Sequence, residues 1–132
     1  MDLYEQNYIL LRLLAPTLKS MPEDEFVSDV TGCLPVYMQI VSQEKYTTTL
    51  MLTYRFENRS FYPKQPDLTI RVYHDAKTAE VMSGFLHGQR RCLRKSRELV
   101  TGLQINRFLY KWLRYCLYRG HELVESRMSR SL

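Results

Sequence analysis

His74 and Asp75 form an adjacent pair of the kind that performs acid–base chemistry. An imidazole beside a carboxylate can act as a general base, and the two groups together can hold a metal ion. Adjacent side chains in a tight turn usually point apart, however, and a turn aspartate commonly bonds nearby backbone groups. The pair therefore allows two interpretations: the centre of a small hydrolase or nucleotide-handling enzyme, or a structural turn. No motif predicts a nucleophile, a cofactor or a metal site, so the enzyme is kept as the alternative.

Basic side chains in the last third of the chain form the second candidate. Residues 1–82 contain 8 Lys and Arg against 11 Asp and Glu, whereas residues 83–132 contain 11 against 3. The formal net charge of +5 therefore arises after residue 82. A surface of one sign attracts partners of the opposite sign. The candidate binding residues for an anionic partner are Arg90, Arg91, Arg94, Arg107, Lys111 and Arg114.

Aromatic residues are interleaved with the cations of the final segment. At spacings of three, four, seven and eleven residues from the first of them, one helix face would carry Arg107, Tyr110, Lys111, Arg114 and Tyr118. Cations bind phosphates, and tyrosine rings stack on bases or on other side chains. The same pattern is typical of a solvated helix back, and no RNA-binding consensus accompanies it. We expect a non-enzymatic binding or regulatory module whose anionic partner is RNA or an acidic protein.

Two helices and an antiparallel sheet are expected to position these residues. A helix is predicted from Asp2, which can cap its first turn, to Ala15, because Pro16 stops it. Apolar and polar residues then alternate from Phe26 to Val81. This alternation predicts a meander of four to five strands with an aliphatic inner face and a threonine-rich outer face.

A C-terminal amphipathic helix is predicted from its apolar periodicity. Its apolar stripe consists of Ile105, Phe108, Leu109, Trp112, Leu113, Cys116 and Leu117. Thr101 can cap this helix and Gly120 can end it. We expect the helix to pack its apolar side on the aliphatic face of the sheet and to leave its cationic side in solvent. Residues 84–102 are expected to form a strand edge followed by a basic loop.

The chain is expected to form a single α+β domain over residues 1–120, followed by a frayed extension over 121–132. Hydrophobic residues make up 45% and charged residues 25%, which excludes general disorder. No apolar run approaches the roughly 18–20 residues that cross a bilayer, so no membrane partner is expected. The three cysteines are an odd number at unrelated spacings, which indicates reduced thiols and a cytoplasmic location.

The outer face of the sheet supports a third interpretation. It would present four aromatic or basic side chains among threonines, namely Tyr37, Arg55, Arg71 and Tyr73. Open sheets of this composition can bind single-stranded nucleic acid, and they can also form dimers or lie under a helix. A protein-interaction module that forms a homodimer through this face therefore stays open as an alternative.

The sequence also resembles a known family. The YqiB-like proteins, small gammaproteobacterial proteins catalogued as a domain of unknown function, look like this chain at RVYHDAKTAEV (71–81) and at INRFLYKWLRYCL (105–117). The threonine run after Tyr46 and the Leu-Leu end of the first helix also fit, so the resemblance covers most of residues 1–120. It implies a cytoplasmic bacterial protein of α+β type. The family has no established activity, and the resemblance therefore implies no catalytic residue.

Within these two strings, polar residues occur at five positions where the fold alone does not require them: Arg71, His74, Asp75, Asn106 and Arg114. A hydrogen-bonded network between the hairpin turn and the final helix would explain them structurally. A ligand pocket between the same elements would explain them functionally. The structural explanation is preferred.

Overall fold

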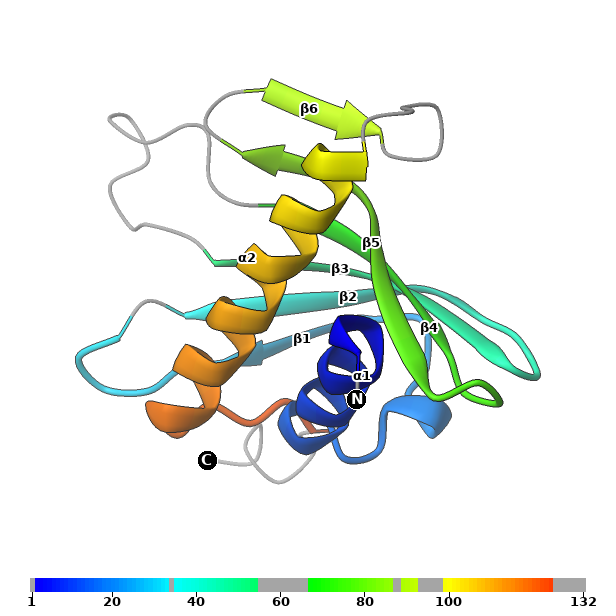
Figure 1. The fold of residues 1–132 in the computed structure, drawn as a ribbon. Coiled ribbons are helices and arrows are strands. Elements are labelled where there is room, and N and C mark those ends of the chain that lie inside the picture. Colours follow the sequence, from blue (N-terminus) through cyan, green and yellow to red (C-terminus); the bar gives the residue numbers. More distant parts are fainter. Residues whose placement is uncertain (1, 34, 55–66, 87–88, 93–98, 125–132) are drawn as a thin grey trace.

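The computed structural model of the protein describes residues 2–33, 35–54, 67–86, 89–92 and 99–124 (Figure 1). The elements in these ranges follow the order α1 (Leu3–Leu14), η1 (Leu18–Ser20), β1 (Glu25–Ser28), β2 (Val36–Gln43), β3 (Thr47–Tyr54), β4 (Asp67–Tyr73), β5 (Thr78–Leu86), β6 (Gln89–Cys92) and α2 (Leu99–Tyr118). Here η1 is a single 3-10 turn.

The strands form one antiparallel meander, because each pairs with the next along the chain. Both α-helices lie on the same face of this sheet (Figure 1). The α+β arrangement expected from the sequence is therefore confirmed. The described sheet has six strands where four to five were expected, because the two short edge strands β1 and β6 add to four long ones.

The core lies between the helices and the inner face of the sheet. The strands bury alternate residues toward the helices, namely Val36, Met38, Ile40, Leu50, Leu52, Leu68, Ile70, Val72, Ala79 and Val81. The apolar stripe of α2 meets them with Ile105, Leu109, Trp112, Leu113 and Cys116. Burying a large aliphatic or aromatic side chain contributes about 1.5–3 kcal/mol before the entropy cost is subtracted. The amphipathic pattern of α2 thus anchors it to the sheet.

Capping residues define the start of α1 and the end of α2. The Asp2 carboxylate accepts a hydrogen bond from the Glu5 N–H at 2.9 Å, and the Glu5 carboxylate accepts one from the Asp2 N–H at 3.1 Å. This capping box confirms the N-terminus predicted for α1. At the end of α2, Gly120 has a positive φ of 91°, a conformation that glycine adopts without strain.

The chain after α2 packs back onto the domain. The His121 N–H donates to the Cys116 carbonyl at 3.0 Å, and the Leu123 N–H donates to the Leu14 carbonyl at 2.7 Å. Both His121 and Leu123 are buried. Residues 121–124 are thus part of the folded unit. The rest of the extension expected over 121–132 lies outside the described residues.

The segment expected to be a strand edge and a basic loop holds more regular structure. β5 continues to Leu86 and pairs with β6 through Leu86 and Gln89. The final helix begins at Leu99, so Thr101 lies within its first turn instead of capping it. Glycines and charged residues interrupt the alternation of apolar and polar residues in this segment, so the sequence does not predict β6. The strand forms because its backbone pairs with β5.

An extra residue in β2 changes which side chains face the core. The register with β3 runs Ile40 to Leu50 and then Ser42 to Thr49, so Val41 has no partner in the ladder. Such a bulge exchanges the two faces of a strand beyond it. Gln43 is consequently paired with the inward-facing Thr48 and points into the molecule.

Candidate functional site

The solvent side of α2 carries the cations that the sequence predicted. Arg107, Lys111 and Arg114 are all exposed. Two tyrosines accompany them: Tyr115 is 54% exposed and Tyr118 is 84% exposed. We call these five residues the cationic face. They span twelve residues of helix, and the first and last lie about 16 Å apart along the axis at 1.5 Å per residue.

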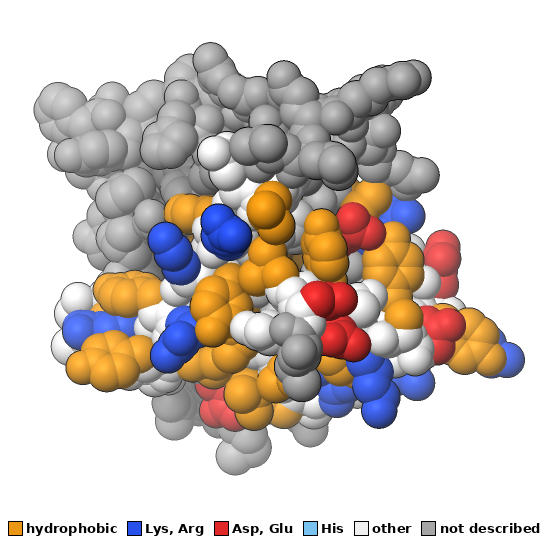
Figure 2. Space-filling view, viewed as in Figure 1, with side chains coloured by type: hydrophobic (Ala, Val, Ile, Leu, Met, Phe, Trp, Pro, Cys, Tyr) orange, Lys and Arg blue, Asp and Glu red, His pale blue; other side chains and the backbone are white. Residues whose placement is uncertain are grey.

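The positive charge of the cationic face is not offset within its own helix. The α2 sequence, LVTGLQINRFLYKWLRYCLY, contains no aspartate or glutamate. Figure 2 shows Lys and Arg side chains along the part of the surface formed by α2, with hydrophobic side chains between them, whereas Asp and Glu side chains lie together with further Lys and Arg side chains nearer to α1. An anion that approaches α2 therefore meets attraction without a competing carboxylate on that helix.

Arg114 is held in place by a neighbouring ring. Its guanidinium carbon lies 5.7 Å from the centroid of the Tyr110 ring, and one guanidinium N–H donates to the Tyr110 hydroxyl at 3.3 Å. Tyr110 is half-buried beside the cationic face. The stacked guanidinium is partly ordered before any partner arrives, which lowers the entropy cost of binding.

The arginine cluster predicted upstream lies largely beyond what the structure describes. Arg90 and Arg91 belong to β6, of which the backbone alone is described. Arg94 lies outside the described residues. A binding role for these three arginines stays a prediction.

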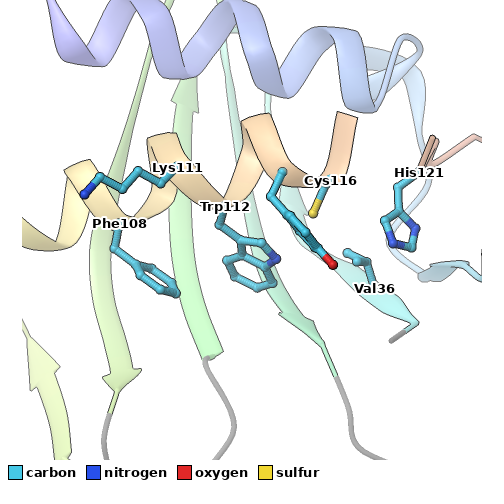
Figure 3. A pocket seen from close by; sticks show the side chains of 7 residues that line it. Val36, Phe108, Lys111, Trp112, Cys116 and His121 are labelled. Carbon is cyan, nitrogen blue, oxygen red and sulfur yellow. The ribbon is translucent and has the colours of Figure 1, made fainter. Parts of the chain in front are cut away.

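A pocket of about 390 Å³ opens beside the cationic face. It is lined by Val36, Phe108, Lys111, Trp112, Tyr115, Cys116 and His121. Figure 3 shows Phe108, Trp112 and Cys116 extending from α2, with Val36 and His121 across from them. Cavities of this size and apolar composition are typical of small-molecule sites.

The two basic side chains of the described lining stand toward opposite ends of the pocket. In Figure 3 the Lys111 ammonium group lies at the Phe108 end, and His121 lies at the opposite end. The Phe108 and Trp112 rings are tilted at 48° with centroids 5.8 Å apart, and they form the aromatic wall between these ends. Lys111 and Tyr115 belong both to this pocket and to the cationic face.

His121 is held in the pocket wall by residues from the other end of the chain. Its Nδ1 atom lies 2.8 Å from the Ser28 hydroxyl, which also accepts a hydrogen bond from the Glu122 N–H at 3.0 Å. Burial lowers the pKa of His121 below 6.5 and outweighs the nearby Asp29 carboxylate, which raises it. The imidazole is therefore neutral at neutral pH.

Cys116 supplies an apolar atom and not a nucleophile. Burial raises the pKa of its thiol to about 12. The thiol is therefore protonated at neutral pH, and the thiolate is the reactive form of cysteine.

The structure separates the two residues of the predicted acid–base pair. His74 is buried on the inner face of the sheet, whereas Asp75 is exposed and its carboxylate accepts a hydrogen bond from the Ala76 N–H at 2.9 Å. This arrangement provides no proton relay between them. The hydrolase alternative thus gains no support from these two residues.

His74 belongs instead to a buried chain of hydrogen bonds. Its Nε2 atom lies 2.7 Å from the Thr48 hydroxyl, which donates to the Gln43 side-chain carbonyl at 2.7 Å. The Gln43 amide donates in turn to the carbonyls of Leu18 at 2.7 Å and Met21 at 2.9 Å. These bonds therefore join β2, β3 and the β4–β5 turn to the segment between α1 and β1.

Asn106 joins α2 to the sheet and to α1. Its side-chain carbonyl accepts from the Val81 N–H at 3.0 Å, and its amide donates to the Gly102 carbonyl at 2.8 Å. Its backbone carbonyl accepts from the Asn7 side chain at 3.2 Å. Because β6 pairs with β5 only from Ser83 onward, Asn106 covers the edge of β5 that β6 leaves open.

Arg71 lies on the opposite face of the sheet. It stands across from Glu80 in the ladder and lines a shallow depression with Thr47, Thr49 and Tyr73. Within the described residues, no hydrogen bond joins any two of Arg71, His74, Asp75 and Asn106. These four residues therefore occupy four separate settings instead of the single network or pocket expected to contain them.

Sequence reasoning did not assign the pocket residues Val36, Tyr115 and His121 to a site. Tyr115 lies four residues after Lys111, so the helical period places it next to the predicted cationic face. Val36 and His121 are far apart in the sequence, and the fold alone brings them together. Among the described residues, no cluster of three His, Cys, Asp or Glu side chains could hold a metal ion. None of the helices described has the length and apolar character that crossing a membrane requires.

Comparisons with known proteins confirm the family that the sequence resembles. The family described as "Protein of unknown function (DUF1249)" matches residues 9–122. Proteins named "Uncharacterized protein YqiB" from Escherichia coli K12, O6:H1 and O157:H7 are each 34% identical to this chain over 125 residues. The match covers 91% of this chain and 87% of each relative. No solved structure was found to match.

Proposed function

The chain belongs to the DUF1249 family, and because that family brings no activity with it, we propose a function from the chain's own surface. The protein is a non-enzymatic binding or regulatory module, and its cationic face binds single-stranded RNA. The observation that carries this proposal is the composition of that face: three exposed cations and two exposed tyrosines on a helix without a carboxylate.

RNA fits this face better than an acidic protein does, because of the tyrosines. Tyr115 and Tyr118 expose 54% and 84% of their surface, and both follow the three cations along α2. An acidic polypeptide needs the cations alone, whereas a single-stranded nucleic acid uses the cations for phosphates and the rings for bases. Stacking of one base on an aromatic side chain contributes about 1–3 kcal/mol.

A cytoplasmic location is part of the same proposal. Cys33 and Cys116 are both free thiols, and Cys33 contacts the Arg119 side chain at 3.1 Å instead of another cysteine. Free thiols are usual in reducing compartments, where RNA is also available.

Fluorescence anisotropy with a short labelled oligouridylate tests the proposal. The double variant Lys111→Gln/Arg114→Gln is expected to raise the Kd by about tenfold, since it removes two phosphate contacts. The matched control is Lys45→Gln, which removes one exposed cation from the β2–β3 turn. Its Kd should stay within about twofold of the wild-type value, because salt screens a distant charge.

The same assay distinguishes RNA from an acidic protein. Poly-glutamate added as a competitor should displace the oligouridylate poorly at equal concentration of negative charge, because it lacks stacking bases. Displacement as efficient as that by unlabelled RNA would assign the face to acidic proteins and overturn the RNA proposal. An unchanged Kd in the double variant would remove the cationic face from binding altogether.

A further inference from the structure

The pocket beside Lys111 has features that the RNA proposal does not require. A face that binds phosphates and stacks bases needs no concave cavity, yet one of about 390 Å³ lies against it. Five of its seven lining residues are apolar or aromatic: Val36, Phe108, Trp112, Tyr115 and Cys116. Its walls would therefore gain little from a hydrated polar ligand and much from an apolar one.

The charge on the pocket lining indicates which polar group a ligand would carry. Among the described residues that line it, Lys111 is the one charged side chain, and none is an aspartate or glutamate. His121 closes the opposite end, and its burial keeps it from adding a second positive charge at neutral pH. The described lining is thus mainly apolar and aromatic, with the Tyr115 hydroxyl and the Trp112 indole N–H among its polar groups, and Lys111 supplies its positive charge.

We propose that this pocket binds a small aromatic molecule that carries one anionic group. The flat body of the ligand lies along the wall formed by Phe108 and Trp112, and the anionic group meets the Lys111 ammonium. Aromatic walls favour a flat ring system, because offset and edge contacts between rings add to the burial of area. This site goes beyond the proposed function and shares with it only Lys111 and Tyr115.

Trp112 provides the readout, because it is the single tryptophan of the chain and lines the pocket. The probes are 1-anilinonaphthalene-8-sulfonate and its uncharged counterpart, N-phenyl-1-naphthylamine. Both accept excitation energy from tryptophan, so quenching of Trp112 emission measures binding of the probe, and the substitutions described next assign that binding to this pocket. The folded wild-type protein is expected to bind the sulfonate about three- to tenfold more tightly than the neutral amine, since only the sulfonate can pair with Lys111.

Two substitutions separate the apolar and charged parts of the site. Lys111→Gln should weaken the sulfonate about three- to tenfold and leave the neutral amine unchanged. Tyr115→Ala should weaken both probes, and its control is Tyr46→Ala, because Tyr46 is 50% exposed on the β2–β3 turn and does not line the pocket. Because both side chains are about half exposed, both variants are expected to fold, and circular dichroism checks the fold of each.

The outcomes keep this proposal apart from the RNA proposal. Arg107→Gln should weaken the oligouridylate but not the sulfonate, because Arg107 belongs to the cationic face and not to the pocket. If RNA binding is absent but the probes bind, the pocket proposal is supported and the RNA proposal is wrong. If RNA binds but the probes do not, the RNA proposal is supported and the pocket proposal is wrong. Equal affinity for the two probes, or a Lys111→Gln variant that binds the sulfonate as the wild type does, would overturn the assignment of an anionic aromatic ligand.

Discussion

The Nε2 atom of His74 lies 2.7 Å from the Oγ1 atom of Thr48, and this contact fixes which imidazole nitrogen carries the proton. The Gln43 amide group donates to two backbone carbonyls, so its oxygen must face Thr48. The single hydroxyl hydrogen of Thr48 goes to that oxygen. The hydrogen between Thr48 and His74 is therefore on Nε2, and within the described residues His74 Nδ1 has no partner.

The two buried histidines predict a loss of stability in mild acid. Burial lowers the pKa of His74 below 6.5, and the charges of Arg12 and Lys19 lower it further; burial also lowers the pKa of His121. Below about pH 6.5 the unfolded chain binds protons that the folded chain does not, so the free energy of unfolding falls as the pH falls toward the folded pKa values. Well above pH 6.5 these two imidazoles are neutral in both states, and their contribution to this dependence vanishes.

Urea unfolding at about pH 7.5 and about pH 5.5 measures this dependence, in a range above the ordinary pKa of Asp and Glu. Each histidine contributes at most about 1.4 kcal/mol per pH unit. Proton NMR of the folded protein gives the matching site-resolved result, with both imidazoles titrating below pH 6.5. An unfolding free energy that is constant or increases toward pH 5.5 would contradict the neutral, buried state of these histidines.

Thr48→Val is predicted to destabilise the protein by about 2–4 kcal/mol. The substitution keeps the shape of the side chain but leaves the Gln43 oxygen without a donor and the His74 Nε2–H without an acceptor, and each buried unpaired group costs about 1–3 kcal/mol. Thr49→Val is the control, because Thr49 is the next residue and lies half-buried on the outer face. Chemical denaturation compares the two, and equal effects would show that the buried chain contributes nothing specific.

Asn106→Ala is predicted to loosen the edge of β5 as well as to lower stability. The variant removes the acceptor of the Val81 N–H, which costs about 1–3 kcal/mol if that group stays buried. Amide hydrogen exchange at Val81 should accelerate more than exchange in the centre of the sheet. Gln104→Ala, at an exposed position of the same helix, should leave the exchange of Val81 unchanged. Protection of Val81 that survives the loss of Asn106 would contradict this edge-covering role.

Gly120→Ala is predicted to destabilise the turn that places His121 in the pocket, because alanine rarely adopts the positive φ found there. The Gly120 N–H donates to the Leu117 carbonyl at 3.1 Å, and the His121 N–H donates to the Cys116 carbonyl at 3.0 Å, which together form a Schellman motif. A Cβ added at Gly120 would meet no atom within 4 Å, so the penalty is one of backbone conformation, about 1 kcal/mol. A thermal unfolding midpoint equal to that of the wild type would show that this turn relaxes without cost.

The sequence predicted the elements whose signals are local. The apolar stripe and the cations of α2 both follow from the helical period, and Gly120 ends that helix as expected. The bulge at Val41 has no such signal, yet it turns Gln43 into the core and completes the buried chain with Thr48. The pocket was equally hidden, because Val36 and His121 meet only after the sheet and both helices are assembled.

The salt dependence of RNA binding tests the central claim about the cationic face most directly. The measurement is the slope of log Kd against log salt concentration for oligouridylate, in the wild type and in the triple variant Arg107→Gln/Lys111→Gln/Arg114→Gln. Release of counterions contributes about 0.7 to the slope for each cation that neutralises a phosphate on a single strand. The triple variant is therefore predicted to have a slope smaller by about 2, and a slope equal to that of the wild type would contradict binding through this face.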